Sequence, residues 1–391
     1  MKPEPHVLFI SSWYPSPTTS EGTFVEMHIL ALQSRGCKCA MMLNGETTMG
    51  NYIGAQFSKK NLLNFRRRED ITFIENLTVH PKPLRFVKDP LAERKKNILK
   101  QSLRSIKAYI ALHGKPDVIF HHGIFDFTYI SEFLSLELNI PIWYMENSPN
   151  IEVDVFPCAN PFETEESLKR FVTKAERRFA VTDGYVKKMR RIFGCNFEKV
   201  PNVITDDYFV EASAERPTDE FVFANVAILD PRKRQDLIIK AFATAFKDDH
   251  SKKLVIAGDG KLKDELKKLS SDLSVSKQVE IPGYLNRDEV KELLDSSHAF
   301  VLASRAETFG VVVVEALARG IPVISSDIPG TREIVTPENG LLFESGNEND
   351  LVRAMKEMVT NYDLYRPSEL IADVKTRFGP DAVKKGLFEN E

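Results

Sequence analysis

The chain has 391 residues, of which 42% are hydrophobic and 28% charged, and its 53 Lys and Arg against 56 Asp and Glu give a net charge of −3. This composition excludes a disordered chain and gives no overall signal for binding polyanions, so we expect no nucleic-acid partner. The length is too great for one small core and predicts two domains of about 200 residues each.

Cysteine usage and the N-terminal residues favour a cytoplasmic protein. The cysteines are Cys37, Cys39, Cys158 and Cys195, and they show neither C-x-x-C spacing nor a neighbouring His cluster. Neither a zinc site nor a disulfide framework is therefore expected. The first residues lack the apolar stretch of a signal peptide, and no apolar run approaches the roughly 20 residues that span a bilayer. We expect a protein that is either free in the cytoplasm or peripheral on the inner face of the cell membrane.

The first half of the chain has the strand, loop, helix, strand order of a βαβ unit. The apolar run 7–11 predicts a buried strand, and a Pro-rich loop follows as far as Gly22. Apolar spacing over 24–34 predicts a helix that ends at Gly36. Further strands are predicted at 37–43, 118–121, 142–145, 178–182 and 199–200, and helices at 90–113 and 163–175.

Positive charge is concentrated in one stretch of this half. Between Lys59 and Lys107 there are 14 Lys and Arg against five Asp and Glu, a local net charge of +9, with apolar residues interleaved. Such a stretch fits two interpretations. One is the solvated face of a helix, and the other is a peripheral contact of 59–107 with an anionic membrane surface.

A second alternating series follows a polar linker at 211–220. Strands are predicted at 221–227, 253–257, 279–281, 299–303 and 321–325, and helices at 235–246, 261–273, 287–296 and 348–360. The predicted fold class is α/β, with two tandem Rossmann-like domains whose parallel sheets face each other across a ligand-binding cleft. We place the domains at 1–205 and 206–361, followed by a C-terminal segment at 362–391.

The most informative motif is E-T-F-G-V-V-V-V-E, from Glu307 to Glu315, with A-L-A-R-G-I-P-V-I behind it. Gly310 lies where a loop enters a short helix. A helix N-terminus offers unpaired N–H groups and a positive dipole end, which suits a phosphate. Glu315, just inside the helix, can accept hydrogen bonds from two vicinal hydroxyls. The alternative is an ordinary helix-to-strand connection with a tight turn.

This motif resembles the donor-binding signature of retaining glycosyltransferase family 4, the glycosyl transferases group 1 set, which has the two-domain GT-B fold. The resemblance implies an N-terminal domain that binds an acceptor and a C-terminal domain that binds a nucleotide-sugar. It also implies that 362–391 crosses back to pack on the first domain. The implied donor-binding residues around the motif are Phe309, Gly310, Val311 and Glu315, and Glu307 would contact the sugar or steer the acceptor.

Further motifs carry the resemblance along the second half. The segment L-D-P-R-K-R resembles the family's second signature and places its lysine at Lys233, which would act on the donor diphosphate. The chain departs from the pattern at Ile228, where Arg is usual, and at Arg234, where Gly is usual. Arg232 and Arg234 are alternative phosphate cations. The loop A-G-D-G implies donor-binding roles for Gly258 and Gly260, and I-P-G-Y-L implies a base site at Tyr284 and Leu285.

In the first half, the loop that ends at Gly22 resembles the family's opening glycine loop, beside the donor phosphates or sugar. P-D-V-I-F-H-H-G resembles a motif whose second histidine falls on His122, which would have a role at the reacting centre. A structural histidine is the alternative. Y-M-E-N-S places Glu146 and Asn147 on the acceptor side, with Asn147 where a His is familiar.

The expected function is transfer of a sugar, with retention, from a nucleotide-diphosphate sugar to a saccharide or lipid-linked saccharide acceptor. The resemblance implies a bacterial-type polysaccharide or lipopolysaccharide pathway. We expect no metal and no other cofactor, because a lysine and a helix terminus would stabilise the leaving phosphate. Two alternatives stay open: a non-catalytic partner that binds nucleotide-sugar, and a GT-B sugar phosphorylase or hydrolase.

Overall fold

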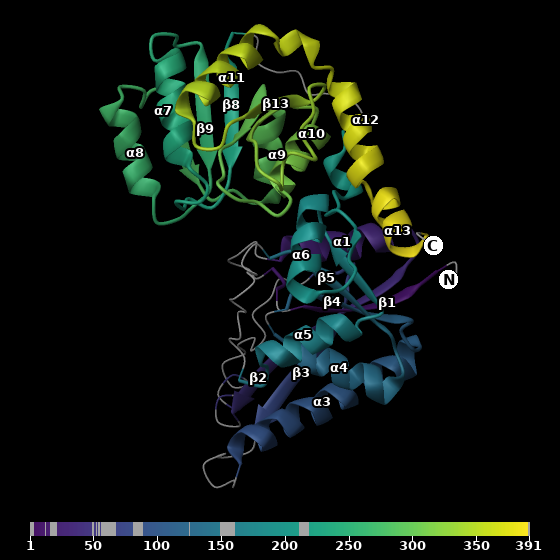
Figure 1. The fold of residues 1–391 in the computed structure, drawn as a ribbon. Helices are drawn as coiled ribbons and strands as arrows, with labels where there is room; N and C mark the ends of the chain where they lie inside the picture. Colours follow the sequence, from purple (N-terminus) through teal and green to yellow (C-terminus); the bar gives the residue numbers. More distant parts are fainter. Residues whose placement is uncertain are drawn as a thin grey trace. The chain divides into compact units, whose positions relative to one another are not determined.

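The computed structural model describes residues 4–11, 13–15, 22–48, 51, 53, 55, 68–80, 89–124, 126–148, 161–210 and 219–389. The chain forms two compact units (Figure 1). The N-terminal unit comprises Met1–Val181, Val186–Val203 and Lys384–Glu391, and the C-terminal unit comprises Thr182–Tyr185 and Ile204–Val383.

The N-terminal unit is built on a seven-stranded sheet with the order β3-β2-β1-β4-β5-β6-β7, in which neighbouring strands pair in parallel. The run V-L-F-I at positions 7–10 is fully buried, as expected for a central strand that is covered on both faces. The strands are β1 (His6–Ser11), β2 (Lys38–Thr48), β3 (Thr72–His80), β4 (Val118–His122), β5 (Ile142–Glu146), β6 (Arg177–Ala180) and β7 (Glu198–Lys199).

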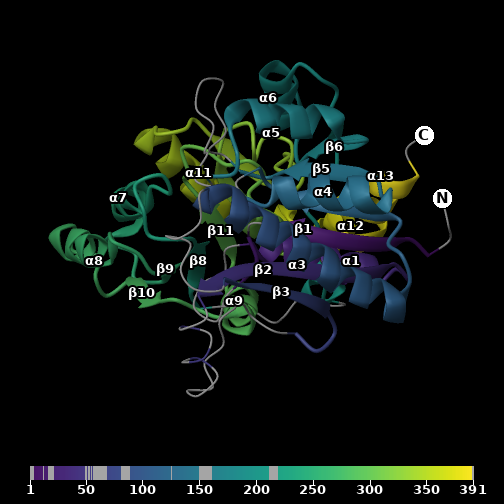
Figure 2. The same ribbon diagram turned by 90° about the horizontal axis from the view of Figure 1, so that it is seen from below.

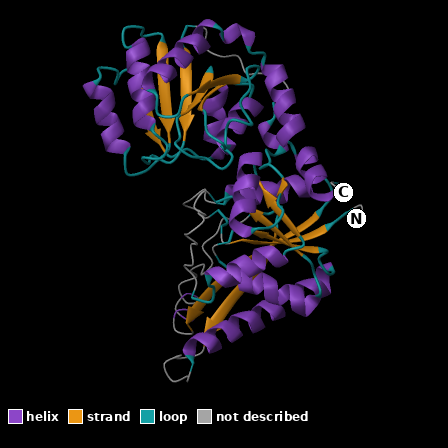
Figure 3. Ribbon diagram, viewed as in Figure 1, coloured by secondary structure: helices purple, strands orange, loops and turns teal. Residues whose placement is uncertain are grey.

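Helices lie on both sides of these strands within the N-terminal unit (Figure 3). They are α1 (Thr23–Gln33), α3 (Pro90–His113), α4 (Thr128–Leu138), α5 (Glu165–Lys174) and, from Val186 on, α6 (Asp183–Phe193). Ile98 and Ile106 of α3 and Leu134 of α4 pack in one core cluster with Leu8 and Ile119 of the sheet. The helix α3 lies along β3, the edge strand (Figure 2).

The C-terminal unit has a six-stranded parallel sheet with the order β10-β9-β8-β11-β12-β13. The helices α7 and α11 pack on this sheet through a large apolar cluster that includes Phe242, Phe246 and Met355. The strands are β8 (Phe221–Val226), β9 (Lys252–Ala257), β10 (Val279–Gly283), β11 (Ala299–Leu302), β12 (Val323–Ser326) and β13 (Gly340–Phe343). The helices are α7 (Gln235–Phe246), α8 (Lys263–Asp272), α9 (Arg287–Asp295), α10 (Val311–Ala318), α11 (Glu348–Thr360) and α12 (Pro367–Phe378). The helix α13 (Pro380–Phe388) begins in this unit and belongs to the N-terminal unit from Lys384 on.

The predicted fold class is confirmed in each unit, since both are Rossmann-like α/β units with a parallel sheet. Among the described residues, the structure adds strands and helices that the sequence analysis did not list: β3, α4, α6, β13, α12 and α13. Much of the basic stretch, including 59–67 and 81–88, lies outside the described residues. Within the described part of the chain, no helix combines the length and apolar character needed to cross a membrane.

Candidate functional site

The carboxyl ends of the six parallel strands in the C-terminal unit lie at one edge of the sheet, and most of the predicted donor-binding residues directly follow them. The loop after β8 carries Lys233, and the loop after β11 carries Glu307. β8 and β11 are neighbours, although β9 and β10 separate them in the chain, so the strand order reverses between them. Such a switch point is where open α/β sheets bind ligands.

Lys233 and Glu307 form an ion pair across this switch point. The Lys233 Nζ lies 2.5 Å from the Glu307 Oε1, and the Ser304 hydroxyl donates a hydrogen bond of 2.7 Å to the same oxygen. The two charged side chains are 23% and 15% exposed, so the pair is largely shielded from water. The structure therefore brings together two of the three predicted catalytic residues, at the edge of the sheet where a phosphate is expected.

Gly330 packs closely against the backbone of Glu307. A Cβ atom on Gly330 would lie 2.1 Å from the Glu307 carbonyl oxygen, so only Gly allows the loop after β12 to pack there. The hydroxyl of Thr182 also donates a hydrogen bond of 3.3 Å to the carbonyl of Thr308, the next residue. The position of Glu307 is thus fixed from the backbone side.

Gly258 and Gly260 pack on the loop that leads to Lys233. A Cβ atom would lie 1.9 Å from the Ala227 carbonyl oxygen at Gly258, and 2.4 Å from the Leu229 carbonyl oxygen at Gly260. The Leu229 N–H also donates to the Asp259 carbonyl at 2.9 Å. These two glycines are required by close packing of two loops, and their contact with a donor stays a prediction.

The helix α10 begins after Gly310, whose φ of 78° is in the left-handed region. Val311 is its first residue and leaves an N–H group without a helical acceptor, as every helix start does. Phe309 is 1% exposed, and its ring packs against Phe378 in the interior of the unit. A contact between Phe309 and a donor would therefore come from its backbone.

Glu315 is buried inside α10, with 8% of its surface exposed, and it faces Tyr208. Burial raises the pKa of the Glu315 carboxyl, and a hydrogen bond with the Tyr208 hydroxyl opposes this rise. The Tyr208 ring is itself 2% exposed. The Arg287 guanidinium lies 4.7 Å from the ring centroid and the Lys291 ammonium 5.1 Å from it.

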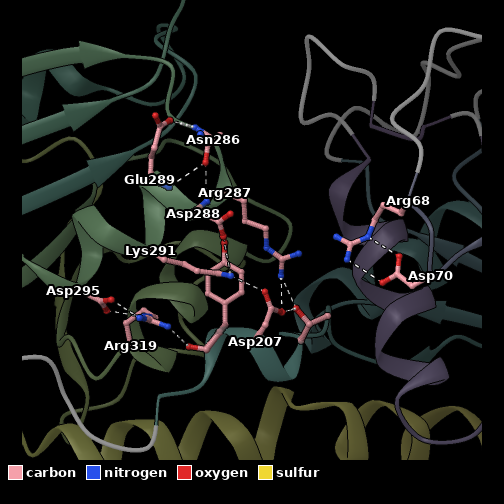
Figure 4. A network of polar contacts seen from close by, with 12 residues as sticks. Arg68, Asp70, Asp207, Asn286, Arg287, Asp288, Glu289, Lys291, Asp295 and Arg319 are labelled. Atoms are coloured by element: carbon pink, nitrogen blue, oxygen red, sulfur yellow. Dashed lines mark hydrogen bonds and ion pairs between the residues drawn. The ribbon is translucent and has the colours of Figure 1, made fainter. Parts of the chain in front are cut away.

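The segment that carries Tyr208 is held by two cations of α9 and by Arg319, which directly follows α10 (Figure 4). The Asp207 carboxylate accepts hydrogen bonds from Arg287 at 3.2 Å and from Lys291 at 2.7 Å. The Tyr208 carbonyl accepts one from Arg319 at 3.1 Å. The sequence analysis did not assign Tyr208, Arg287 or Lys291 to the site, because no motif or spacing connects 205–208 with Glu315.

The remaining predicted residues of this unit lie near the same edge. Tyr284 is 59% exposed, and Leu285 beside it is half-buried. Ile228, where the resembled pattern has Arg, is 54% exposed. Arg232 bonds to Asp230 at 2.6 Å, and Arg234 bonds to Asp236 at 3.0 Å, so each alternative phosphate cation already has a local acidic partner.

In the N-terminal unit, His122 ends β4 and is fully buried. Its ring lies 4.4 Å from the Phe120 ring and 5.3 Å from the His28 ring, measured between centroids. Burial, with His28 and His121 nearby, holds the pKa of His122 well below its ordinary value, so the imidazole is neutral. Gly22 begins α1 with a φ of 82°, and a Cβ atom there would lie 2.7 Å from the backbone of Trp13.

Glu146 and Asn147 lie at the end of β5, next to β4. The Glu146 carboxylate is fully buried and accepts hydrogen bonds from the N–H groups of Asn147 at 2.9 Å and Ser148 at 2.6 Å. It also accepts one from the Tyr144 hydroxyl. The Asn147 amide donates to Asn202 at 2.7 Å. Glu146 therefore shapes the turn that carries Asn147.

We expect Glu146→Gln to flatten the pH dependence of stability in the N-terminal unit. Burial raises the pKa of Glu146 from 4.5 to about 7. The folded unit thus holds this proton more tightly than the unfolded chain does. The stabilisation is fully present below the unfolded pKa of 4.5 and is lost as the pH rises through about 7. The free energy of unfolding of the wild type should fall relative to that of the variant by about 3 kcal/mol over this window.

The measurement is urea unfolding at several pH values, with tryptophan fluorescence as the signal that monitors unfolding. The chain has two tryptophans, Trp13 and Trp143, and both lie in the N-terminal unit. Glu137→Gln, at an exposed position of α4, is the control and should run parallel to the wild type. Parallel curves for Glu146→Gln and the wild type would contradict the prediction.

Comparison with known proteins agrees with this geometry. The model of the family described as glycosyl transferases group 1 matches residues 209–370. An uncharacterized glycosyltransferase of Methanocaldococcus jannaschii is 31% identical over 170 residues, which are 43% of this chain and 43% of that protein. The GDP-mannose-dependent monoacylated alpha-(1-6)-phosphatidylinositol monomannoside mannosyltransferase of Corynebacterium glutamicum is 27% identical over 215 residues, which are 50% of this chain and 56% of that protein. The chain thus spans about half the length of these curated relatives.

Among solved structures, the apo form of the lipopolysaccharide outer core galactosyltransferase WaaB superposes with a TM-score of 0.68 at 16% identity, covering 98% of this chain and 99% of that one. The two units therefore form the two-domain Rossmann-like GT-B fold. The match of residues 209–370 to the glycosyl transferases group 1 model confirms the resemblance to that group predicted from the sequence.

Proposed function

We propose that this chain is a glycosyltransferase that moves a sugar from a nucleotide-diphosphate sugar to a saccharide or lipid-linked saccharide acceptor. The observation that carries the proposal is the Lys233–Glu307 pair at the switch point between β8 and β11. A relative that depends on GDP-mannose and a structural neighbour from lipopolysaccharide synthesis support it. Polysaccharide or lipopolysaccharide synthesis is the setting that we propose.

In this mechanism, negative charge grows on the donor β-phosphate as the sugar departs. Lys233 would exchange Glu307 for a phosphate oxygen, and the N-terminus of α10 would place its N–H groups against the same charge. Glu307, released from Lys233, would face the sugar or steer the acceptor. We propose transfer with retention by front-face attack, in which the leaving phosphate takes the proton of the acceptor hydroxyl.

The proposed acceptor side consists of Asn147 with Glu146 behind it, and His122 is proposed to serve the reacting centre. Because the pKa of His122 is held well below its ordinary value, the neutral ring would act as a hydrogen-bond partner and not as a cation. Glu146 would act through the turn at Asn147, since one carboxylate oxygen is already bonded to the backbone of that turn and the other to the Tyr144 hydroxyl.

We expect transfer to continue in excess chelator. Lys233 and the start of α10 supply the positive charge that a divalent ion supplies in other transferases. The measurement is sugar transfer before and after dialysis against EDTA, with rates expected to agree within about twofold. Loss of transfer in EDTA that is restored by magnesium or manganese would disprove metal independence.

The proposed function is tested in two stages. UDP-, GDP- and ADP-sugars are first screened for a rise in melting temperature, because a ligand of the native state stabilises it by mass action. The donor that binds is then incubated with saccharide and lipid-linked acceptors, and with phosphate or water alone. Transfer only with an acceptor supports the proposal, and turnover with phosphate or water alone identifies a phosphorylase or a hydrolase. Tight binding without any turnover identifies a non-catalytic binding partner, an alternative favoured by the departures at Ile228 and Asn147.

A further inference from the structure

The cations of α3 divide into two sets according to what they contact. The Arg94 guanidinium bonds to the Glu46 carboxylate at 2.6 Å and lies over the Phe162 ring. The Lys95 ammonium lies 5.3 Å from the centroid of the Tyr129 ring. These two side chains thus have partners within the N-terminal unit.

The second set forms a stripe on the exposed face of the helix. Lys96, Lys100, Arg104 and Lys107, which we call the cationic stripe, recur at spacings of three and four residues. They lie opposite the buried face formed by Ile98, Ser102 and Ile106. Lys96 has a weak pairing with Glu93 at 3.5 Å, whereas Lys100, Arg104 and Lys107 have no acidic partner among the described residues. The stripe is about 16 Å long at 1.5 Å per residue.

A groove between β3 and α3 opens beside the stripe. It has a volume of about 520 Å³ and is lined by Thr78, Val79, Asn97, Lys100, Gln101, Leu103, Arg104 and Lys107. This volume suits a small polar group. The lining combines cations with amide and hydroxyl groups, which is the donor set that a phosphate requires.

Thr78 gives a second, independent indication of a ligand. It is 3% exposed, and its hydroxyl has no hydrogen-bond partner among the described residues. Its neighbour on the same face, Asn76, is fully engaged, with bonds of 2.8 Å to Ser102 and 2.7 Å to Asn44. A buried hydroxyl without a partner is costly, so an unpaired one in the wall of a cationic groove points to an acceptor supplied from outside.

We propose that this groove binds the phosphate head group of an anionic phospholipid, and that the cationic stripe of α3 lies on an anionic membrane surface. The cations of the stripe lie in a line along one face of the helix. All of them can therefore contact a flat layer of head groups at the same time. The described lining of the groove includes no aromatic side chain of the kind on which single-stranded nucleic acid stacks. The inference does not depend on the proposed sugar transfer, because its test uses neither donor nor acceptor.

The experiment is co-sedimentation of the full chain with phosphatidylcholine vesicles, with and without phosphatidylglycerol. We expect binding only to the anionic vesicles, with a decline as salt rises. Each cation near such a surface strengthens binding roughly fivefold, so Lys100→Gln, Arg104→Gln and Lys107→Gln together should weaken it about 100-fold. Lys261→Gln, Lys267→Gln and Lys268→Gln together are the matched control, since they remove the same charge from exposed positions in α8 and just before it and should leave binding within about twofold.

Thr78→Val distinguishes binding of a phosphate in the groove from non-specific electrostatic attraction between the cationic stripe and the membrane. It keeps the shape of the side chain, removes one hydrogen bond to a charged group, and should weaken binding roughly tenfold. Equal losses in the two triple variants, or no loss from Thr78→Val, would overturn the proposal. Displacement of the protein from vesicles by millimolar glycerol phosphate would show that the groove takes a soluble phosphate, and stronger binding to an RNA oligonucleotide than to the vesicles would assign it to nucleic acid.

Discussion

Lys233→Ala should lower the turnover of sugar transfer by about 100-fold or more, with a smaller change in the KM for the donor. Charge on the diphosphate grows as the glycosidic bond breaks, so an interaction with Lys233 is stronger in the transition state than in the ground state. The size follows from the loss of one preorganised charge donor, about 3 kcal/mol. The measurement is steady-state kinetics with the donor and acceptor identified by screening.

The controls come from the same loop. Arg232→Ala removes a cation that is 62% exposed and bonded to Asp230, so its turnover should stay within about threefold of the wild type. Lys233→Ala also leaves Glu307 without its ion-pair partner, so Glu307→Gln is measured alone and in combination with Lys233→Ala, and a double-mutant cycle compares the losses. Near wild-type turnover of Lys233→Ala would remove Lys233 from the mechanism and transfer its role to Arg232 or Arg234.

Ile228→Arg is a companion to this test. Ile228 is 54% exposed, so the loop has room for the longer side chain that the resembled pattern places there. The substitution should tighten binding of the nucleoside diphosphate, because it adds a second cation, besides Lys233, at the position where the resembled pattern has Arg. Unchanged affinity would mean that Lys233 and the N-terminus of α10 already neutralise the diphosphate, so that a further cation adds no binding energy.

Glu315→Ala should weaken binding of the nucleoside diphosphate by roughly 10- to 150-fold, the equivalent of 1.5–3 kcal/mol for hydrogen bonds to a charged group. The carboxylate would accept hydrogen bonds from two vicinal hydroxyls of the ribose. The Tyr208 hydroxyl lies close enough to this carboxylate to oppose the rise of its pKa, and we expect it to orient the carboxylate. Calorimetric titration of the nucleotide into folded protein measures the effect.

A double-mutant cycle tests whether Tyr208 acts through Glu315. Tyr208→Phe alone should weaken nucleotide binding about fivefold, and it should add nothing in the Glu315→Ala background. Tyr365→Phe, which removes a hydroxyl elsewhere in the same unit, is the control and should bind normally. Unchanged affinity of Glu315→Ala would exclude the ribose role, and additive effects would make Tyr208 a structural residue only.

The central strands that the sequence predicted correctly contain short unbroken apolar runs, as at 7–10 and 118–120. The strand β3 was missed because polar residues occupy its inward positions: Asn76, Thr78 and His80 are buried beside Ile74. Asn76 and His80 are accommodated by bonds to Ser102 and Glu46. These partners lie far away in the sequence, so no local pattern shows them.

The helix α4 was missed for a different reason. Its N-cap is Phe127, with a φ of 67° and no side-chain cap, so the Ser, Thr, Asp or Asn that usually marks a helix start is absent. Arg234 is the comparable case at the start of α7, where an Arg with a φ of 54° occupies a left-handed position. The Gly of the resembled pattern suits that conformation better.

For the candidate site, the sequence predicted single residues but not their pairing. Lys233 and Glu307 are 74 positions apart, and they meet only because β8 and β11 are neighbours. Tyr208 could not be predicted at all, since its relation to Glu315 depends on how Asp207 is held by Arg287 and Lys291. The sequence identifies residue types at strand ends, and the order of the strands decides which of them face each other.

Lys384–Glu391 belong to the N-terminal unit, and this affects the order in which the two units can fold during synthesis on the ribosome. Arg177 donates a hydrogen bond to the Leu387 carbonyl, Lys384 donates one of 2.7 Å to the Arg35 carbonyl, and the Phe388 ring lies 5.2 Å from the Trp143 ring. The unit whose sheet is synthesised first therefore lacks these contacts until 384–391 have been synthesised. The C-terminal unit, complete at Val383, has every residue it needs earlier, so the half made second is the first that can finish folding.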